Sequence, residues 1–234
     1  MNAIELRFAL IHSPLVGPSC WRDVERSLRL DGHDALAVDY GPIRGAGWYG
    51  EAAARIAAGL GDGRGRWILV GNSGAGGLIP SIVEAARGLV SAVVFIDAIL
   101  PHAGRTWLET APGPLAERLR GLASDGRLPP WNEWFDADPT LVLIPDKALR
   151  AALVADLPCV ALAALSAPAP SGGDWEALPC LYLQLSAAYA SEAREARRRG
   201  WRVCSETMHH LAMVTEPERA GEILVQAARA LVAP

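Results

Sequence analysis

The segment Gly71-Asn72-Ser73-Gly74-Ala75 places a serine between small residues, directly after an apolar run that ends at Val70. An amphipathic run follows, so Ser73 lies between a predicted strand and a predicted helix. A serine on such a strained bend is exposed as a nucleophile, and small neighbours relieve the crowding. The first N–H groups of the helix favour an anion there. The alternative is a tight turn with a capping serine.

A serine nucleophile needs a base to accept its proton, and the base needs an acid to orient it. The histidines of the chain are His12, His33, His102, His209 and His210. His209 and His210 follow the last predicted strand and precede the final predicted helix. Adjacent side chains point in different directions, which makes the pair a poor metal site. We assign His210 as the base; the alternative is an ordinary surface-loop histidine.

Alternating strands and helices are predicted to position these residues. Expected strands cover residues 4–11, 34–39, 66–70, 92–96, 179–185 and 201–205, and expected helices cover residues 21–28, 51–60, a run after Ser73 and a run from about Thr215. This alternation predicts an α/β fold with about six mainly parallel strands, covered by helices on both faces. We found no internal repeat.

The alternation breaks between Pro101 and Leu178, where tryptophans, prolines and two helical runs near 114–124 and 146–156 occur. We interpret residues 101–178 as a helical cap inserted after the fourth strand, and residues 1–100 and 179–234 as the core. A cap in this place lies over the carboxyl ends of the strands, where open α/β sheets bind ligands. The alternative is two helices with a long surface loop.

Composition excludes several classes of function. The 234 residues are 51% hydrophobic, enough for one domain with a large core. A net charge of −4 without a long basic run argues against nucleic-acid binding. Charged residues and prolines interrupt the apolar segments, the first residues do not resemble a signal peptide, and the cysteines lack metal-site spacing. We therefore expect a cytoplasmic protein with buried thiols at Cys20, Cys159, Cys180 and Cys204.

Three motifs together resemble the α/β-hydrolase fold family, and within it the small capped esterases and hydroxynitrile lyases. His12-Ser-Pro-Leu-Val-Gly-Pro-Ser-Cys-Trp21 is similar to the family's H-G-x-x-x-G-x-x-x-W, Gly71–Ala75 is similar to its nucleophile elbow, and His210–Pro217 is similar to its base loop. The family histidine stands seven residues before this proline, which selects His210 over His209. The resemblance covers nearly the whole chain.

The resemblance implies an oxyanion hole, and this sequence departs from it at one position. One donor would be the N–H of Gly74, which follows the nucleophile. The second would come from the position of Pro14, and proline has no N–H. Loss of one such donor typically costs about 3–4 kcal/mol of transition-state stabilisation. We expect Leu15 or Ser13 to supply a replacement, unless the reaction needs no full hole.

The acid is also displaced from its usual place in the family. After the fifth predicted strand the chain reads Ser186-Ala-Ala-Tyr189, without a carboxylate. Phe95–Pro101 is similar to the segment that carries the acid in haloalkane dehalogenases, which makes Asp97 our candidate. Glu192 is the alternative, and a site without an acid is a third possibility.

The resemblance therefore implies hydrolysis of an ester, lactone or thioester bond in a hydrophobic or aromatic small molecule, without cofactor or metal. Alternatives are a non-hydrolytic lyase, cyclase or rearranging enzyme, and a catalytically silent ligand-binding protein. We expect a monomer or homodimer without nucleic-acid or membrane partners, and His12 to hold its loop together. Expected substrate-binding residues are Pro14, Asn72, His102, Trp107, Trp131 and Trp134.

Overall fold

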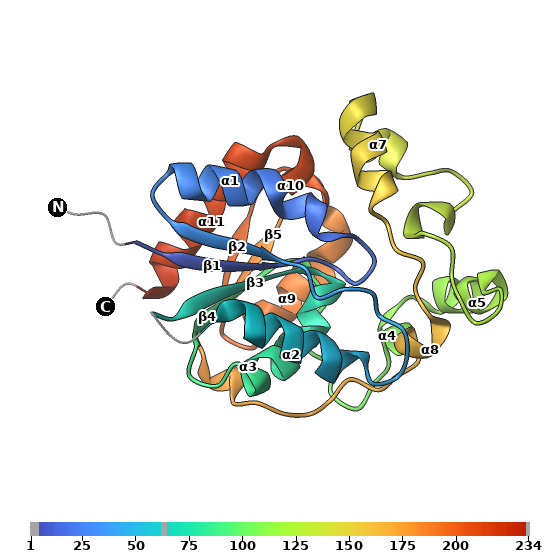
Figure 1. Cartoon of the computed structure of the whole chain (residues 1–234), viewed down its shortest axis with the longest axis horizontal. Helices are drawn as coiled ribbons and strands as arrows, with labels where there is room; N and C mark the ends of the chain where they lie inside the picture. The colour runs from blue at the N-terminus through green and yellow to red at the C-terminus, as the bar shows by residue number, and fades with distance from the viewer. Residues whose placement is uncertain (1–4, 62–64, 233–234) are drawn as a thin grey trace.

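Six parallel strands form a single sheet (Figure 1). The structure, a computed structural model, describes residues 5–61 and 65–232. The strands are β1 (Arg7–Ile11), β2 (Asp34–Val38), β3 (Trp67–Ser73), β4 (Val90–Ala98), β5 (Cys180–Gln184) and β6 (Arg202–Ser205). Their order is β2-β1-β3-β4-β5-β6, and every neighbouring pair is parallel, as the sequence predicts. The first predicted strand begins at residue 4, and this residue lies outside the described residues.

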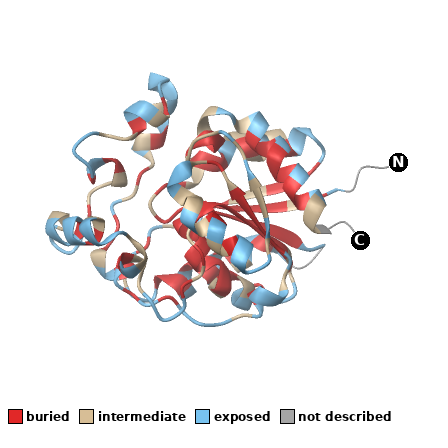
Figure 2. Cartoon of the chain, turned by 180° about the vertical axis from the view of Figure 1, so that it is seen from behind, coloured by how far each residue is buried: buried red, intermediate tan, exposed pale blue. Residues whose placement is uncertain are grey.

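Alternate residues of the strands belong to two separate hydrophobic clusters, one on each face of the sheet. In β1, Phe8 and Leu10 belong to one cluster, and Ala9 and Ile11 belong to the other. This division follows from the pleat, because successive side chains of a strand point to opposite faces. The central strands β3 and β4 are buried almost throughout (Figure 2), which explains their continuous apolar sequences.

Helices cover both faces of the sheet. They are α1 (Arg22–Leu30), α2 (Trp48–Leu60), α3 (Ile79–Ala85), α9 (Ala190–Arg198) and α11 (Pro217–Val232). The buried residues of α1 and α11 join one cluster, and those of α2, α3 and α9 join the other. None of the helices in the described ranges is long and apolar enough to span a membrane.

Two helices differ from the sequence prediction. Helix α2 begins at Trp48 rather than residue 51, because Trp48 and Tyr49 are buried and pack together at 4.0 Å between ring centroids. The Trp48 indole also donates a hydrogen bond of 3.0 Å to the carbonyl oxygen of Ala164. Helix α9 was not predicted, since it buries only Ala193 and Ala196 and its other residues are largely charged.

The four cysteines are free thiols in the structure. Cys20 and Cys180 are buried, as expected. Cys204 is half-buried, and Cys159 is exposed, so the expectation of a buried thiol is wrong at Cys159.

Most of the segment between β4 and β5 lies beyond the carboxyl ends of the strands, and its last part runs back past α3 to the start of β5 (Figure 1). It contains the short helices α4 (Trp107–Thr110), α5 (Gly113–Leu122), α6 (Thr140–Leu143), α7 (Lys147–Ala155) and α8 (Leu162–Leu165). Helices α5 and α7 are the two helical runs that the sequence predicts. We call residues 101–178 the cap, and its definition as a separate domain stays a prediction.

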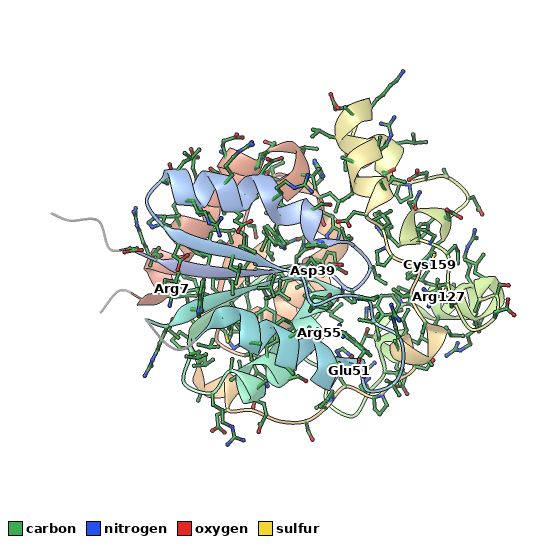
Figure 3. The ribbon with its side chains drawn as sticks, in the orientation of Figure 1. Arg7, Asp39, Glu51, Arg55, Arg127 and Cys159 are labelled. Atoms are coloured by element: carbon green, nitrogen blue, oxygen red, sulfur yellow. The ribbon has the colours of Figure 1, made fainter. Side chains whose placement is uncertain are left out.

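Contacts within the cap tie its distant parts together. The Arg127 guanidinium donates a hydrogen bond of 2.7 Å to the carbonyl oxygen of Cys159, and both residues lie far from the sheet (Figure 3). Arg127 also forms an isolated antiparallel bridge with Ala161, and Thr106 forms one with Pro168. The first half of the cap is therefore bound to its second half by hydrogen bonds and short bridges.

Candidate active site

Ser73 is the last residue of β3 and has a strained backbone, with φ 54° and ψ −123°. A side chain at positive φ is uncommon, and such strain persists only where the surrounding structure imposes it. A 3-10 turn (Gly74–Leu78) follows, and α3 begins after it. A Cβ atom on Gly76 would overlap the carbonyl oxygen of Ile99, so only glycine allows this close approach to the end of β4. The sharp bend predicted at Ser73 is present, with a 3-10 turn in front of the helix.

His210 and Asp97 meet beside this bend. His210 lies in the loop after β6, and Asp97 lies near the end of β4 with its side chain fully buried. The Nδ1 atom of His210 is 3.4 Å from Oδ2 of Asp97. This distance is long for a hydrogen bond, as is common in ligand-free catalytic sites. Glu192, the alternative acid, forms no hydrogen bond or ion pair with His210 among the described residues and instead accepts a hydrogen bond from Ser191.

The segment after β5, where the family acid would stand, binds Asp97. The backbone N–H groups of Leu185 and Ser186 donate to Oδ1 of Asp97 at 2.7 and 3.1 Å. The Ser186 hydroxyl donates to Oδ2 at 2.6 Å. Three donors therefore fix the Asp97 carboxyl group, and Oδ2 still faces His210. The sequence did not single out Ser186, whose only signal was its position in that segment.

Tyr189 links the serine to the histidine. Its hydroxyl lies 3.2 Å from Oγ of Ser73, and its ring stacks on His210 with centroids 4.9 Å apart and 14° between the planes. Burial raises the pKa of Tyr189 to about 12, so the phenol is neutral near pH 7. No direct hydrogen bond joins Ser73 to His210 in the described part of the chain. Sequence reasoning missed Tyr189, which was noted only as part of a segment without a carboxylate.

The corner opposite the base is formed by the first loop and Gly74. A Cβ atom on Gly74 would lie 2.9 Å from Cδ of Pro14, so a larger residue would collide with the proline ring. The N–H of Leu15, one expected replacement donor, points to Oγ of Ser13 at 3.3 Å. This N–H is therefore engaged within the loop.

Comparisons with known proteins bear on the fold of the chain. No protein-family model matches the sequence, and no curated protein matches it significantly. Solved structures match with high confidence. An extracellular alpha/beta-hydrolase from a Paenibacillus species is 18% identical, with a TM-score of 0.77 over 95% of this chain and 98% of its own. Tomato methylketone synthase I is 17% identical, with a TM-score of 0.75 over 98% and 100%. Polyneuridine aldehyde esterase is 16% identical, with a TM-score of 0.72 over 96% and 100%.

The chain has the α/β-hydrolase fold. The solved structures match it over nearly its full length, and the parallel sheet, the bend after β3 and the loop after β6 occur in the order that the sequence resemblance implies. At these identities the likeness concerns the fold.

Within the α/β-hydrolase fold, Ser73 and His210 open into an apolar cavity of about 200 Å³ below the cap. Trp107, Trp131 and Trp134 of the cap line this cavity, and their role in substrate binding stays a prediction. The other lining residues are Ser13, Leu15, Val16, Leu115, Phe135, Tyr189 and Leu211. The cavity therefore offers a few polar atoms near the bend and an aromatic wall on the cap side.

Three expected substrate-binding residues do not line the cavity. The Asn72 side chain is buried and donates to the carbonyl oxygen of Ile96 at 3.1 Å. His102 lies against Gly77, its Nε2 is 3.5 Å from the hydroxyl of Tyr49, and burial lowers its pKa. Pro14 packs on Gly74 but contributes no surface to the cavity. Asn72 and His102 therefore support the walls of the site from behind.

The remaining histidines of the site region have structural contacts. His12 stacks on Tyr40 at 4.1 Å, and its Nδ1 is 2.8 Å from the carbonyl oxygen of Ser13, which holds the first loop as expected. His209 contacts the hydroxyl of Thr215 at 2.8 Å. Within residues 5–61 and 65–232, no group of three or more histidine, cysteine or acidic side chains is placed to hold a metal ion.

Proposed function

We propose that this protein is a serine hydrolase that cleaves an ester, lactone or thioester bond in a hydrophobic or aromatic small molecule. Ser73 is the nucleophile, His210 the base and Asp97 the residue that orients His210. One observation carries the proposal: the strained Ser73 and His210 line the same cavity, and the buried Asp97 contacts His210 from behind. The α/β-hydrolase fold supports it, because related folds host this chemistry at the same strand ends.

In the proposed reaction, His210 accepts the Ser73 proton while Oγ attacks the substrate carbonyl carbon. Asp97 holds the imidazole and stabilises the imidazolium that forms. The alcohol or thiol then leaves with the proton from His210, and water hydrolyses the acyl-enzyme by the same route. The ligand-free contact between Ser73 and Tyr189 must open first, so that Oγ can turn to His210.

The lining of the cavity supports a hydrophobic substrate. The cap contributes aromatic side chains, and Trp107 packs edge-on against Trp134 at 6.1 Å between centroids. An aromatic wall excludes water and favours an apolar acyl or alcohol group. One solved neighbour is named as an esterase, and another was crystallised with 2-tridecanone.

Hydrolysis of a series of p-nitrophenyl esters tests this proposal. We expect turnover by the natural sequence and its loss in Ser73→Ala and His210→Gln. Ser81→Ala is the matched control, because Ser81 lies on α3 outside the cavity. Equal turnover by Ser73→Ala and the natural sequence would contradict the proposal.

A non-hydrolytic reaction is the second candidate, and two observations favour it. Pro14 supplies no backbone donor, and the Ser73 hydroxyl is bound to Tyr189 instead of His210. A lyase or cyclase that uses His210 alone as base needs neither an acyl-enzyme nor a full oxyanion hole. In that case Ser73→Ala retains turnover of a β-keto acid or cyanohydrin, and His210→Gln loses it.

A further inference from the structure

The oxyanion corner lacks a second free backbone donor. Pro14 has no N–H, and the N–H of Leu15 is engaged with Ser13. The N–H of Gly74 alone would therefore face the negative charge that develops on a substrate carbonyl oxygen. Hydrolases of this kind commonly use two donors, and a side-chain hydroxyl can serve as one of them.

The Ser13 side chain lies at this corner. It is fully buried, lines the cavity together with Ser73, and its Oγ would lie 3.2 Å from a Cβ atom placed on Gly74. Its backbone is fixed, because the carbonyl oxygen accepts hydrogen bonds from the N–H of Val16 at 3.0 Å and from the His12 ring at 2.8 Å. The hydroxyl is therefore held next to Gly74 by a rigid loop.

The hydrogen bonds of Ser13 leave its proton free. Oγ accepts from the Leu15 N–H at 3.3 Å, and no described residue accepts the hydroxyl proton in return. A hydroxyl carries one donor and two acceptor sites, so Ser13 retains its full donor capacity. The bond from Leu15 also polarises the O–H group and strengthens it as a donor.

We propose that the Ser13 hydroxyl is the second oxyanion donor and replaces the N–H that Pro14 cannot supply. The inference rests on the proposed hydrolase function. In the tetrahedral intermediate, Ser13 Oγ–H and the Gly74 N–H both donate to the substrate oxygen. The Ser13 proton stays on its oxygen throughout, so no bond to Ser13 forms or breaks. Leu15 then acts indirectly, as the group that orients Ser13.

The test compares Ser13→Ala with Ser13→Thr, which keeps a hydroxyl, and with Ser81→Ala as a control outside the cavity. The readouts are kcat and KM for p-nitrophenyl butyrate and the inhibition constant of a trifluoromethyl ketone, which forms an oxyanion on Ser73. We expect Ser13→Ala to lower kcat by about 10²–10³-fold with little change in KM. Its affinity for the ketone inhibitor should fall in parallel, and Ser13→Thr should recover at least tenfold of the lost kcat.

A second variant separates this role from a structural one. Pro14→Ala in the Ser13→Ala background restores a backbone N–H at the corner, and we expect it to recover at least tenfold of the lost rate. A kcat for Ser13→Ala within tenfold of the natural protein overturns the inference, and so does a loss that neither Ser13→Thr nor the added Pro14→Ala recovers. Failure of the hydrolase proposal can be told apart from failure of the Ser13 inference. In the first case the natural protein itself would not hydrolyse the ester.

Discussion

Contacts among four side chains, Asp97, His210, Tyr189 and Ser73, define the chemistry at the residue scale. Asp97 faces His210, the ring of His210 stacks on Tyr189, and the Tyr189 hydroxyl contacts Ser73. These contacts join the four side chains in one row, and the Ser73 hydroxyl is bound to Tyr189 instead of His210. The change needed for reaction is a short movement of the Ser73 hydroxyl away from Tyr189.

Tyr189→Phe tests the effect of that contact. The variant keeps the ring that stacks on His210 and removes the hydroxyl that binds Ser73. Loss of a hydrogen bond worth about 1 kcal/mol should raise the rate at which a fluorophosphonate modifies Ser73 by about fivefold. Inactivation kinetics measure this rate. A slower reaction than that of the natural protein would show that the Tyr189 hydroxyl assists Ser73.

Asp97→Asn and Glu192→Gln identify the acid. An asparagine offers no negative charge to the His210 imidazolium. Its NH2 group is also a donor, so it cannot accept all the hydrogen bonds that Leu185 and Ser186 donate to the Asp97 carboxylate. We expect kcat for p-nitrophenyl butyrate to fall by up to about 10⁴-fold in Asp97→Asn. Glu192→Gln should stay close to the natural protein. The reverse pattern would contradict the assignment of Asp97.

At the scale of elements, the ends of the strands position the proposed catalytic side chains, and the cap lines the cavity above them. The carboxyl ends of β3 and β4 carry Ser73 and Asp97, and the loop after β6 carries His210. The cap adds the aromatic wall. The residues of the proposed triad thus come from two strand ends and one loop, and the cap supplies the aromatic side of the cavity.

Trp134→Leu tests whether the cap sets substrate size. Trp134 is almost fully buried and lines the cavity, so a smaller side chain should leave more room for an acyl chain. We expect the ratio of kcat/KM for p-nitrophenyl octanoate to that for the butyrate to rise. Trp175→Leu is the control, since Trp175 is also buried but does not line the cavity. An unchanged ratio in Trp134→Leu would argue against this role of the cap.

Local patterns in the sequence were sufficient to predict the sheet and the bend at Ser73, because apolar runs and small residues specify these features over short distances. The choice of His210 over His209 and the choice of Asp97 rest on the resemblance to known families, and the roles of both residues stay predictions. Tyr189 could not be predicted in this way. Its contact with Ser73 joins residues 116 positions apart and depends on how two loops meet. The same limit applies to His102, which was expected to bind substrate: its Nε2 lies 3.5 Å from the hydroxyl of Tyr49, and it does not line the cavity.

At the scale of the whole molecule, the buried histidines link stability to pH. Burial lowers the pKa of His12 and of His102 below the ordinary value of about 6.5. The unfolded chain therefore binds more protons than the folded one once the pH falls below that value. Both residues contribute stability that is fully present above pH 6.5 and is lost as the pH falls through their folded pKa values.

Urea unfolding at several pH values measures this linkage. We expect the free energy of unfolding to be constant near pH 7.5 and to decrease toward pH 5.5. His102→Asn should make the dependence shallower, because one of the histidines with a lowered pKa no longer titrates. A free energy of unfolding that stays constant down to pH 5.5 would contradict this expectation.

Ser73 is the proposed activated nucleophile of this α/β-hydrolase fold, and its reactivity can be measured directly. Peptide mapping by mass spectrometry after treatment with a fluorophosphonate tests it most directly. We predict a single adduct on Ser73 in the natural protein and no adduct in Ser73→Ala or in His210→Gln. A folded, catalytically active protein in which Ser73 remains unmodified would contradict the claim.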